Sequence, residues 1–418
     1  MEHEEFNFDD IMAELQAQLY EDTGRKPQES QVKREPETGR QPKQEKQPRE
    51  VRPVAEPEVK KPSFIRRLGR FFARWLIFLM LTALLLAVTA YGALYVVCKG
   101  PSESARDLFV MSVRETSAIG FLADLFLSEE EIAAIENKSG IEEYIETDTS
   151  LITITKPEDN ADENAESAEN QGPVADAWGF VDEDGDGIII NEVKGEGYSG
   201  YMMIIQDPSR VIMGSVPKAY GGRGYTVEAM VAEFDAVAGI NAGGFEDPEG
   251  KGNGSIPNSM VVYEGKVYYE GKGTGSGFVG IDSNYILHVA KTISSAEVEA
   301  KGIQYGVSFG PVLVSNGEAC DVGASGVNPR TAIGQRSDGA ILMLVIDGRQ
   351  VISLGATYQD LVDIFLEYGA VNACNLDGGS SSLMWFGDDY VNNCASVIGI
   401  RPVPTTFLVL KEGVDGNE

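Results

Sequence analysis

The residues best suited to chemistry lie in the run NLDGGSSS, which begins at Asn375. Asp377 directly follows an apolar stretch, and Gly378, Gly379 and Ser380 come next. A carboxylate in such a place can act as acid, base or nucleophile. The N–H groups of the two glycines and the serine can form an anion-binding nest. The run is neither a Walker loop, because no Gly-Lys-Ser/Thr follows, nor a G-x-S-x-G elbow, because the second glycine is absent.

A second polar run, NAGGFED, also follows an apolar stretch and begins at Asn241. The Asn241 amide can both donate and accept hydrogen bonds, as sugar hydroxyls require. Gly243 and Gly244 leave room for a ligand beside the backbone. Glu246 and Asp247 add two carboxyl groups. Taken alone, the run is equally typical of an ordinary glycine turn.

Two further runs place arginines at the ends of apolar stretches. In NPRTA, Arg330 and Thr331 lead into a predicted strand, and in VIDGR, Asp347 and Arg349 follow one. A guanidinium binds a carboxylate or phosphate through two parallel hydrogen bonds. The alternatives are a surface salt bridge for Arg330 and a local turn for Asp347 and Arg349. Carboxylates with arginines fit glycosyl chemistry on a phosphorylated substrate.

Histidine and metal chemistry find little support. The two histidines, His3 and His288, are too few for a multi-histidine metal site or most His-based triads. His288 lies in the apolar stretch YILHVA, which predicts a core residue. Asp182, Asp184 and Asp186 open a calcium-loop pattern, but its closing glutamate is displaced and a strand pattern follows. We therefore favour an acidic turn over a calcium site, and expect no cofactor.

The charge of the 418-residue chain argues against nucleic acid as a partner. The chain has 34 Lys and Arg residues against 65 Asp and Glu residues, a formal net charge of −31. A polyanion of this size is repelled by a phosphate backbone. Residues 1–74 are neutral overall, so the imbalance falls on the remainder of the chain.

A predicted membrane span marks the same boundary. Residues 75–98 contain no charged side chain, and about 20 apolar residues cross a bilayer. The basic segment 61–74 precedes the span, and the positive-inside rule then places the N-terminus in the cytoplasm. We expect a single-pass cell-membrane protein whose C-terminal domain is extracytoplasmic. Residues 1–60 predict a largely disordered cytoplasmic tail, for which the sequence indicates no specific partner.

Beyond the span the pattern of residue types changes along the chain. Residues 99–156 predict a helical juxtamembrane region, and residues 157–175 an acidic linker. Residues 176–411 alternate short apolar stretches with glycine turns, and residues 412–418 form a tail. This pattern predicts a mixed α+β domain. Helices are expected from Thr226 to a stop at Gly239 and from Thr357 to Gly369, each within a strand-helix-strand unit.

Seven runs in order resemble the phosphodiester glycosidase family, whose best-known member is N-acetylglucosamine-1-phosphodiester α-N-acetylglucosaminidase. The resemblance covers about residues 195–411, and the architecture is similar to membrane-anchored bacterial members. The chain departs from the family pattern in having Ala242 within Asn-Ala-Gly, and Ser380 directly after Gly379. The matching runs are INAGGF, GSIPNSMVVYEGKV, SFGPVLVSNG, NPRTAIGQ, VIDGR, TYQDLVDIFLEYGA and NLDGGSSS.

This resemblance implies a mixed-sheet domain that hydrolyses a sugar-1-phosphodiester in cell-surface or exported polysaccharide. We expect Asp377 as the essential carboxylate, with Asp347 second and Glu246 or Asp247 as substitutes. The expected substrate-binding residues are Asn241, Gly243, Gly244, Arg330, Thr331, Arg349, Gly378, Gly379 and Ser380. The alternative is a non-catalytic glycan-binding or scaffold protein that uses the same cleft. Substrate and membrane are the expected partners.

Overall fold

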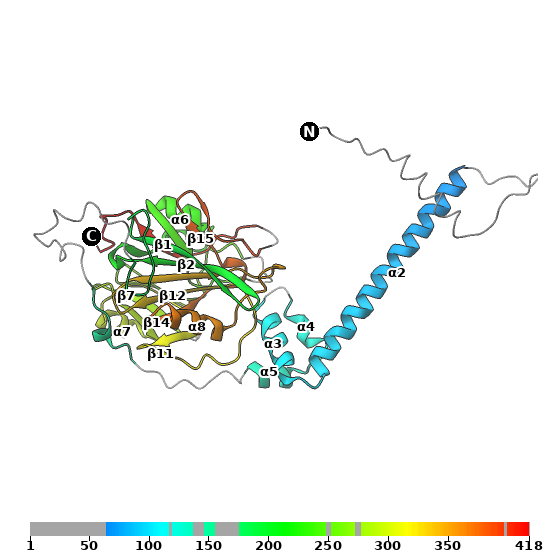
Figure 1. Ribbon diagram of the computed structural model, residues 1–418, viewed down its shortest axis with the longest axis horizontal. Coiled ribbons are helices and arrows are strands. Elements are labelled where there is room, and N and C mark those ends of the chain that lie inside the picture. Colours follow the sequence, from blue (N-terminus) through cyan, green and yellow to red (C-terminus); the bar gives the residue numbers. More distant parts are fainter. Residues whose placement is uncertain are drawn as a thin grey trace, which may run out of the picture. The chain divides into compact units, whose positions relative to one another are not determined.

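The computed structural model describes residues 64–116, 119–136, 146–154, 175–247, 252–271, 277–396 and 399–417. Figure 1 colours these parts along the chain and labels the main elements. The predicted tail of residues 1–60, and all but the last residue of the predicted linker 157–175, lie outside the described residues.

One long helix, α2, runs from Phe64 to Lys99 (Figure 1). From Leu68 to Lys99 it is apolar and long enough to cross a membrane, with a mean hydropathy of 2.3. Its apolar side chains are exposed almost throughout, as expected of a helix made to face lipid. Among the residues that the structure describes, this is the one helix that could span a membrane, as predicted. It begins earlier than the predicted span, because residues 64–74 of the basic segment 61–74 are also helical.

Short helices follow α2, as the capping patterns predict. They pack around a small core that includes Cys98, Val110 and Ile132. Ser128 and Glu131 form the reciprocal capping bonds expected at the start of the last helix, with N···O distances of 2.8 and 3.2 Å. The helices are α3 (Glu103–Arg114), α4 (Phe121–Asp124) and α5 (Glu129–Glu136).

Three sheets build the domain beyond residue 175, and all neighbouring strands in them are antiparallel. The largest, in spatial order, contains β1 (Ile188–Gly195), β2 (Tyr198–Ile205), β13 (Ile341–Ile346), β12 (Arg330–Arg336), β14 (Ala370–Leu376), β10 (Val312–Ser315) and β11 (Glu318–Ala319). The second contains β16 (Asp389–Tyr390), β15 (Met384–Phe386), β4 (Ala236–Asn241), β17 (Thr405–Leu410) and β3 (Val211–Ser215). The third contains β6 (Lys266–Gly271), β5 (Ser259–Tyr263), β9 (Ile303–Ser308), β7 (Phe278–Asp282) and β8 (Leu287–Ala290).

The mixed α+β class is confirmed, and two strand-helix-strand units have the same design. Helix α6 (Val227–Glu233) joins β3 to β4, and helix α8 (Tyr358–Glu367) joins β13 to β14. In each case one antiparallel strand, β17 or β12, lies between the two joined strands. The joined strands therefore run in the same direction. β4 ends at Asn241, and Asp377 directly follows the last residue of β14.

The boundaries of α8 follow the predicted signals, whereas α6 ends earlier than predicted. Thr357 and Asp360 form a capping box, and Gly369 stops α8 with φ 76°. Helix α6 ends at Glu233, and Asp235, with φ 51°, turns the chain into β4. Gly239, the predicted helix stop, lies instead within β4. A side chain would not fit there, because a Cβ would lie 2.6 Å from the Leu408 side chain.

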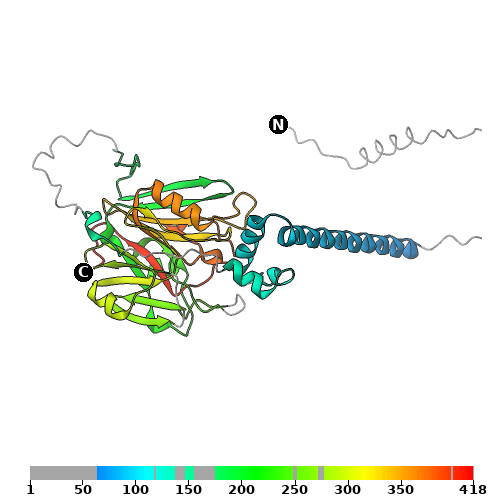
Figure 2. The same ribbon diagram turned by 90° about the horizontal axis from the view of Figure 1, so that it is seen from below.

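Alternate side chains of β2 enter two cores, as a strand buried on both faces requires. Met203 faces a core shared with β4, β7 and β17. Met202 faces the core beneath α8, which contains Phe365. Figure 2 shows α8, in orange, along one face of the large sheet. His288 is 6% exposed and bonds Asp282 at 3.0 Å, which confirms it as a core residue.

The acidic run before β1 forms a turn. Asp182 accepts hydrogen bonds from the N–H groups of Gly185 and Gly187, and Asp186 accepts one from Ile188. The carboxylates of Asp182, Asp184 and Asp186 have oxygens within 4.8 Å of one another. The bonds are those of the favoured acidic turn, and the calcium alternative stays a prediction.

Candidate active site

The ends of β4 and β14 meet, which brings together the two polar runs that follow them. The N–H of Asp377 donates to the carbonyl of Ala242 at 2.9 Å. The Asn241 Nδ2 donates to the carbonyl oxygen of Asp377 at 2.6 Å. These bonds fix the backbone of Asp377 against the end of β4, so its position depends on both strand-helix-strand units.

Asn241 is fully buried, and protein groups use its amide. Its Oδ1 accepts hydrogen bonds from the Thr331 hydroxyl at 2.9 Å and the Leu383 N–H at 3.1 Å. Thr331 is also fully buried. Both residues were expected to contact substrate, but here they join β4, β12 and the segment before β15. Their geometry is that of residues that hold Asp377 in place.

Replacing Asn241 with Ala is expected to lower the free energy of unfolding by about 3 kcal/mol, because several buried polar groups lose their partners. A urea titration of the purified chain in detergent measures this loss. Asn191→Ala is the matched control, because the Asn191 Nδ2 has no hydrogen-bond partner among the described residues. Equal losses for the two variants would contradict the assigned role of Asn241.

Asp377 is the most perturbed carboxyl group of the site. It lies half-buried just beyond β14. Burial raises the pKa of Asp377 to about 7, although hydrogen bonds from Ser381 and the Gly378 N–H and the charge of Arg401 oppose the rise. A carboxyl group that titrates near neutrality is suited to proton transfer or nucleophilic attack.

Arg401, which the sequence analysis missed, lies beside this carboxyl group. Its guanidinium binds Asp247 through two hydrogen bonds of 2.6 and 2.9 Å. It also donates to the Ser380 hydroxyl at 3.2 Å and stacks 5.0 Å from the Phe245 ring centroid. Burial alone would raise the pKa of Asp247, but the paired guanidinium keeps it below its ordinary value. Arg401 thus links NAGGFED to NLDGGSSS.

The remaining residues of NAGGFED occupy different surroundings. A Cβ on Gly243 would lie 3.1 Å from the Thr405 hydroxyl, and one on Gly244 would lie 2.9 Å from the Phe309 ring. Protein side chains therefore fill the space beside these two glycines. Glu246 is exposed, in contrast to the half-buried Asp247.

Arg349 lies over Gly379 at the other side of NLDGGSSS. A Cβ on Gly379 would lie 3.3 Å from the guanidinium, and the φ of +65° also favours glycine there. The guanidinium donates to Thr116 Oγ1 at 2.9 Å and to Asn328 Oδ1 at 3.3 Å. Burial, with the nearby charge of Arg330, lowers the pKa of Arg349. Among the described residues no carboxylate pairs with Arg349, so its charge is free to bind an anion.

Arg330 is nearby but is largely committed to the protein. Its Nη2 donates to Glu115 at 2.7 Å and to the carbonyl of Gly326 at 2.6 Å, and its Nε donates to Ala356. The guanidinium lies 4.2 Å from the Tyr358 ring centroid. Arg330 therefore fastens the site to the segment after α3, which carries Glu115.

Asp347, the expected second carboxylate, is enclosed by the turn after β16. It is 4% exposed. One oxygen accepts from Asn392 Nδ2 and the Asn393 N–H, both at 3.0 Å, and the other accepts from Asn393 Nδ2 at 3.2 Å. Asn392 Nδ2 also donates to the Ser382 carbonyl at 3.1 Å. These contacts suit a residue that positions the Ser382 segment.

The residues that the sequence analysis missed gave weak signals. Arg401 is a single arginine before a proline, and Glu115 lies in a helical region with no sequence link to the domain. Gly378 has a packing role that the sequence does not indicate, because a Cβ there would lie 2.8 Å from the Pro329 carbonyl oxygen. This glycine pair thus serves packing as well as any ligand.

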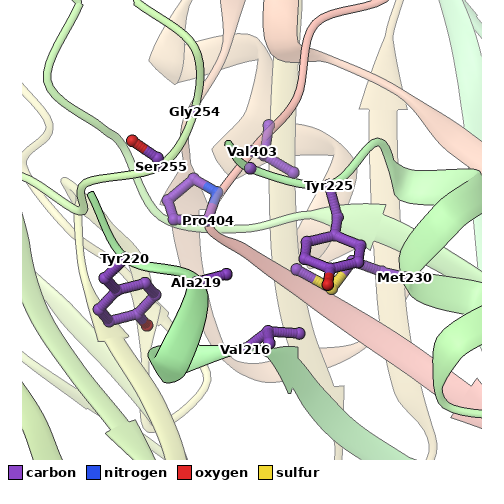
Figure 3. A pocket seen from close by; sticks show the side chains of 10 residues that line it. Val216, Ala219, Tyr220, Tyr225, Met230, Gly254, Ser255, Val403 and Pro404 are labelled. Carbon is purple, nitrogen blue, oxygen red and sulfur yellow. The ribbon is translucent and has the colours of Figure 1, made fainter. Parts of the chain in front are cut away.

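None of these charged groups lines the pocket shown in Figure 3. Figure 3 shows Tyr220, Tyr225 and Met230 facing it, with Val403 and Pro404 on another side. Its ten lining residues include no acid and no arginine. The chemistry is therefore expected at Asp377 instead.

A family model matches the part of the chain that carries most of these residues. Residues 234–410 match the model of the phosphodiester glycosidase family. The matched segment contains Asp377, Arg349 and Arg401 but not Glu115. The match supports a hydrolase that acts on phosphodiester-linked glycosyl bonds.

The individual relatives are distant. The SPbeta prophage-derived uncharacterized protein YomE of Bacillus subtilis (strain 168) is 30% identical over 195 residues. That alignment covers 43% of this chain and 29% of YomE, so the chain spans less than a third of its relative.

Two solved structures are also similar. The zebrafish N-acetylglucosamine-1-phosphodiester alpha-N-acetylglucosaminidase catalytic domain, auto-inhibited by its pro-peptide, has 18% identity and a TM-score of 0.44, covering 54% of this chain and 82% of that chain. A hypothetical protein from Synechocystis has 16% identity and a TM-score of 0.38, covering 54% and 62%. The roles proposed below rest on this chain's own residues.

Proposed function

We propose that this protein is a membrane-anchored glycosidase that hydrolyses a sugar-1-phosphodiester of the N-acetylglucosamine-1-phosphodiester type. The observation that carries the proposal is Asp377, a half-buried carboxyl group with a pKa of about 7. Two arginines flank the run that contains it: Arg349 lies close to Gly379, and Arg401, paired with Asp247, donates to the Ser380 hydroxyl. The family match of residues 234–410 supports the same reaction class.

In this reaction the bond between the sugar C1 and the phosphate oxygen breaks. The phosphate leaves with the bonding electrons as a phosphomonoester, and water supplies the new hydroxyl at C1. A phosphate leaving group has a low pKa, so it needs little help from a general acid. Ionised Asp377 either attacks C1 or takes a proton from the attacking water. Arg349 binds the phosphate and stabilises the charge that develops on it.

The sugar contacts are assigned to polar atoms that the protein leaves unpaired. Asn375 is the next-to-last residue of β14, two residues before Asp377. The Asn375 Oδ1 and the Ser382 hydroxyl are buried without a hydrogen-bond partner among the described residues. Such groups are costly unless a ligand or water satisfies them. They replace Asn241 as the proposed partners of sugar hydroxyls.

The location follows from α2 and its flanks. The basic residues that precede the apolar part of α2 favour a cytoplasmic N-terminus. The catalytic domain then lies outside the cell membrane, where cell-surface or exported polysaccharides supply the substrate.

Incubation of the purified full chain in detergent with an N-acetylglucosamine-1-phosphodiester tests the function. We expect free N-acetylglucosamine and the phosphomonoester in equal amounts. Saturable binding without cleavage would favour a glycan-binding module instead.

The pH dependence of kcat/KM is a further prediction. Asp377 must be ionised in either proposed role, so kcat/KM is expected to rise about tenfold per pH unit below pH 6. It should level off above pH 8, with a midpoint near the Asp377 pKa of about 7. Initial rates with a soluble substrate at low concentration measure this profile. A rate that falls above pH 7 would mean that Asp377 acts as a general acid.

A further inference from the structure

A short aliphatic loop projects into solvent directly after Arg349. The relative exposures of Val351, Ile352 and Leu354 are 101%, 80% and 60%. Bare aliphatic side chains grouped in this way mark an interaction surface.

The loop is a defined turn. The Arg349 N–H donates to the Leu354 carbonyl at 3.1 Å, and the Gln350 N–H donates to the Ser353 carbonyl at 2.9 Å. The Leu354 N–H donates to the Gly197 carbonyl at 2.8 Å, which anchors the turn to the β1–β2 hairpin. The three aliphatic side chains are therefore presented on a rigid base, next to the guanidinium proposed to bind phosphate.

The chain itself ties this region to the end of the apolar helix. From Lys99 at the end of α2, helix α3 adds about 18 Å before the chain reaches Thr116. The Thr116 hydroxyl then accepts the hydrogen bond from Arg349. Glu115 is bound to Arg330 and accepts from the Gly326 N–H at 3.0 Å.

The helices after α2 also present apolar groups beside it. Phe126 packs against Tyr91 and Tyr95 of α2, with ring centroids 5.0 and 6.4 Å apart. Phe121 and Leu125 of the same segment are each 58% exposed. Aromatic and aliphatic side chains next to a membrane-spanning helix are typical of the lipid–water interface.

We propose that the turn Gln350–Leu354 inserts into the surface of the bilayer that α2 spans, and that the substrate is a lipid-anchored sugar phosphodiester. This inference rests on the proposed function. The sugar and its phosphate would enter the site at Asp377 and Arg349 while the lipid group stays in the bilayer beside the turn. The anchor keeps the local concentration of bilayer high, so three aliphatic side chains suffice.

Activity on two substrates tests the substrate class. The full chain in lipid nanodiscs is assayed on N-acetylglucosamine-1-phosphate esterified to hexadecanol, which inserts in the bilayer, and on its water-soluble methyl ester. We expect the double variant V351S/I352S to lower kcat/KM at least tenfold on the hexadecyl ester and less than twofold on the methyl ester. V181S/V414S, at two exposed valines elsewhere, is the control that should leave both rates unchanged. Equal effects of V351S/I352S on the two esters would overturn the proposal.

Fluorescence tests the insertion without any activity. A tryptophan introduced as Ile352→Trp should lose more than half of its added emission in nanodiscs made with brominated lipid chains. A tryptophan introduced as Val181→Trp should lose none. Equal quenching at the two positions would overturn membrane insertion and leave the turn to a protein partner. If quenching is found but neither ester is cleaved, the proposed function fails and the membrane contact stands.

Discussion

Asp377→Asn is expected to lower kcat by at least about a thousandfold, which corresponds to roughly 4 kcal/mol of lost transition-state stabilisation. An amide can neither attack C1 nor accept a proton from water. Because the Asn241 and Ala242 contacts to residue 377 use its backbone, the variant should keep the fold. Single-turnover assays on a soluble sugar phosphodiester measure the loss.

The same substitution is expected to stabilise the protein at alkaline pH. The folded-state pKa of Asp377, about 7, is above the ordinary value of 3.8. The folded protein therefore binds the proton more tightly, and ionisation of Asp377 lowers stability as pH rises from about 4 to 7. The upper bound of this cost is on the order of 4 kcal/mol above pH 7. The variant should unfold at higher urea concentration than the native protein at pH 8, and at a similar one at pH 4.

The exposed Asp388, eleven residues further on, supplies the matched control. Asp388→Asn should leave both kcat and the unfolding midpoint unchanged. An Asp377→Asn protein that is folded and retains more than a tenth of the native rate would remove Asp377 from the chemistry.

Arg349→Met is expected to lower kcat/KM by roughly 10- to 150-fold, because a hydrogen bond to a charged group contributes about 1.5–3 kcal/mol. The free energy of unfolding should stay nearly the same. Arg349 is exposed and makes no ion pair among the described residues, so the substitution leaves no carboxylate without its partner. Kinetics on the soluble methyl ester and a urea titration measure the two effects.

Two comparisons sharpen this prediction. Arg223→Met replaces an exposed arginine and should change neither quantity. Arg330→Met should instead destabilise the protein, because it leaves Glu115 without its partner. If Arg349→Met were strongly destabilising and its kcat/KM unaltered, Arg349 would be a structural residue.

Local signals in the sequence were sufficient to predict most helices and strands. They were not sufficient to predict which side chains contact one another in the site. The capping boxes at Ser128 and Thr357 fixed two helix starts, because those bonds form within four residues. The C-terminal end of α6 was different. Asp235 turns the chain soon after Glu233, and Gly239 fits against Leu408 of β17, a strand that is distant in sequence.

The residues of the site were predictable where the signal was local, and not where it depended on distant parts of the chain. Asp377 stood out because a carboxylate between an apolar strand and two glycines is locally unusual. The burial of Asn241 depends on Thr331 and Leu383, and the enclosure of Asp347 depends on Asn392 and Asn393. Such contacts arise only when the sheets pack, so residue type alone assigned these two side chains to the substrate.

Hydrolysis in water enriched in oxygen-18 tests the central claim most directly, because it shows which bond breaks. The purified full chain is incubated with an N-acetylglucosamine-1-phosphodiester, and the phosphomonoester is examined by phosphorus NMR and mass spectrometry. A glycosidase breaks the C1–O bond, so we expect phosphomonoester without oxygen-18, together with free sugar. One oxygen-18 atom in the phosphate would show attack at phosphorus, and would contradict the proposed reaction and the roles of Asp377 and Arg349.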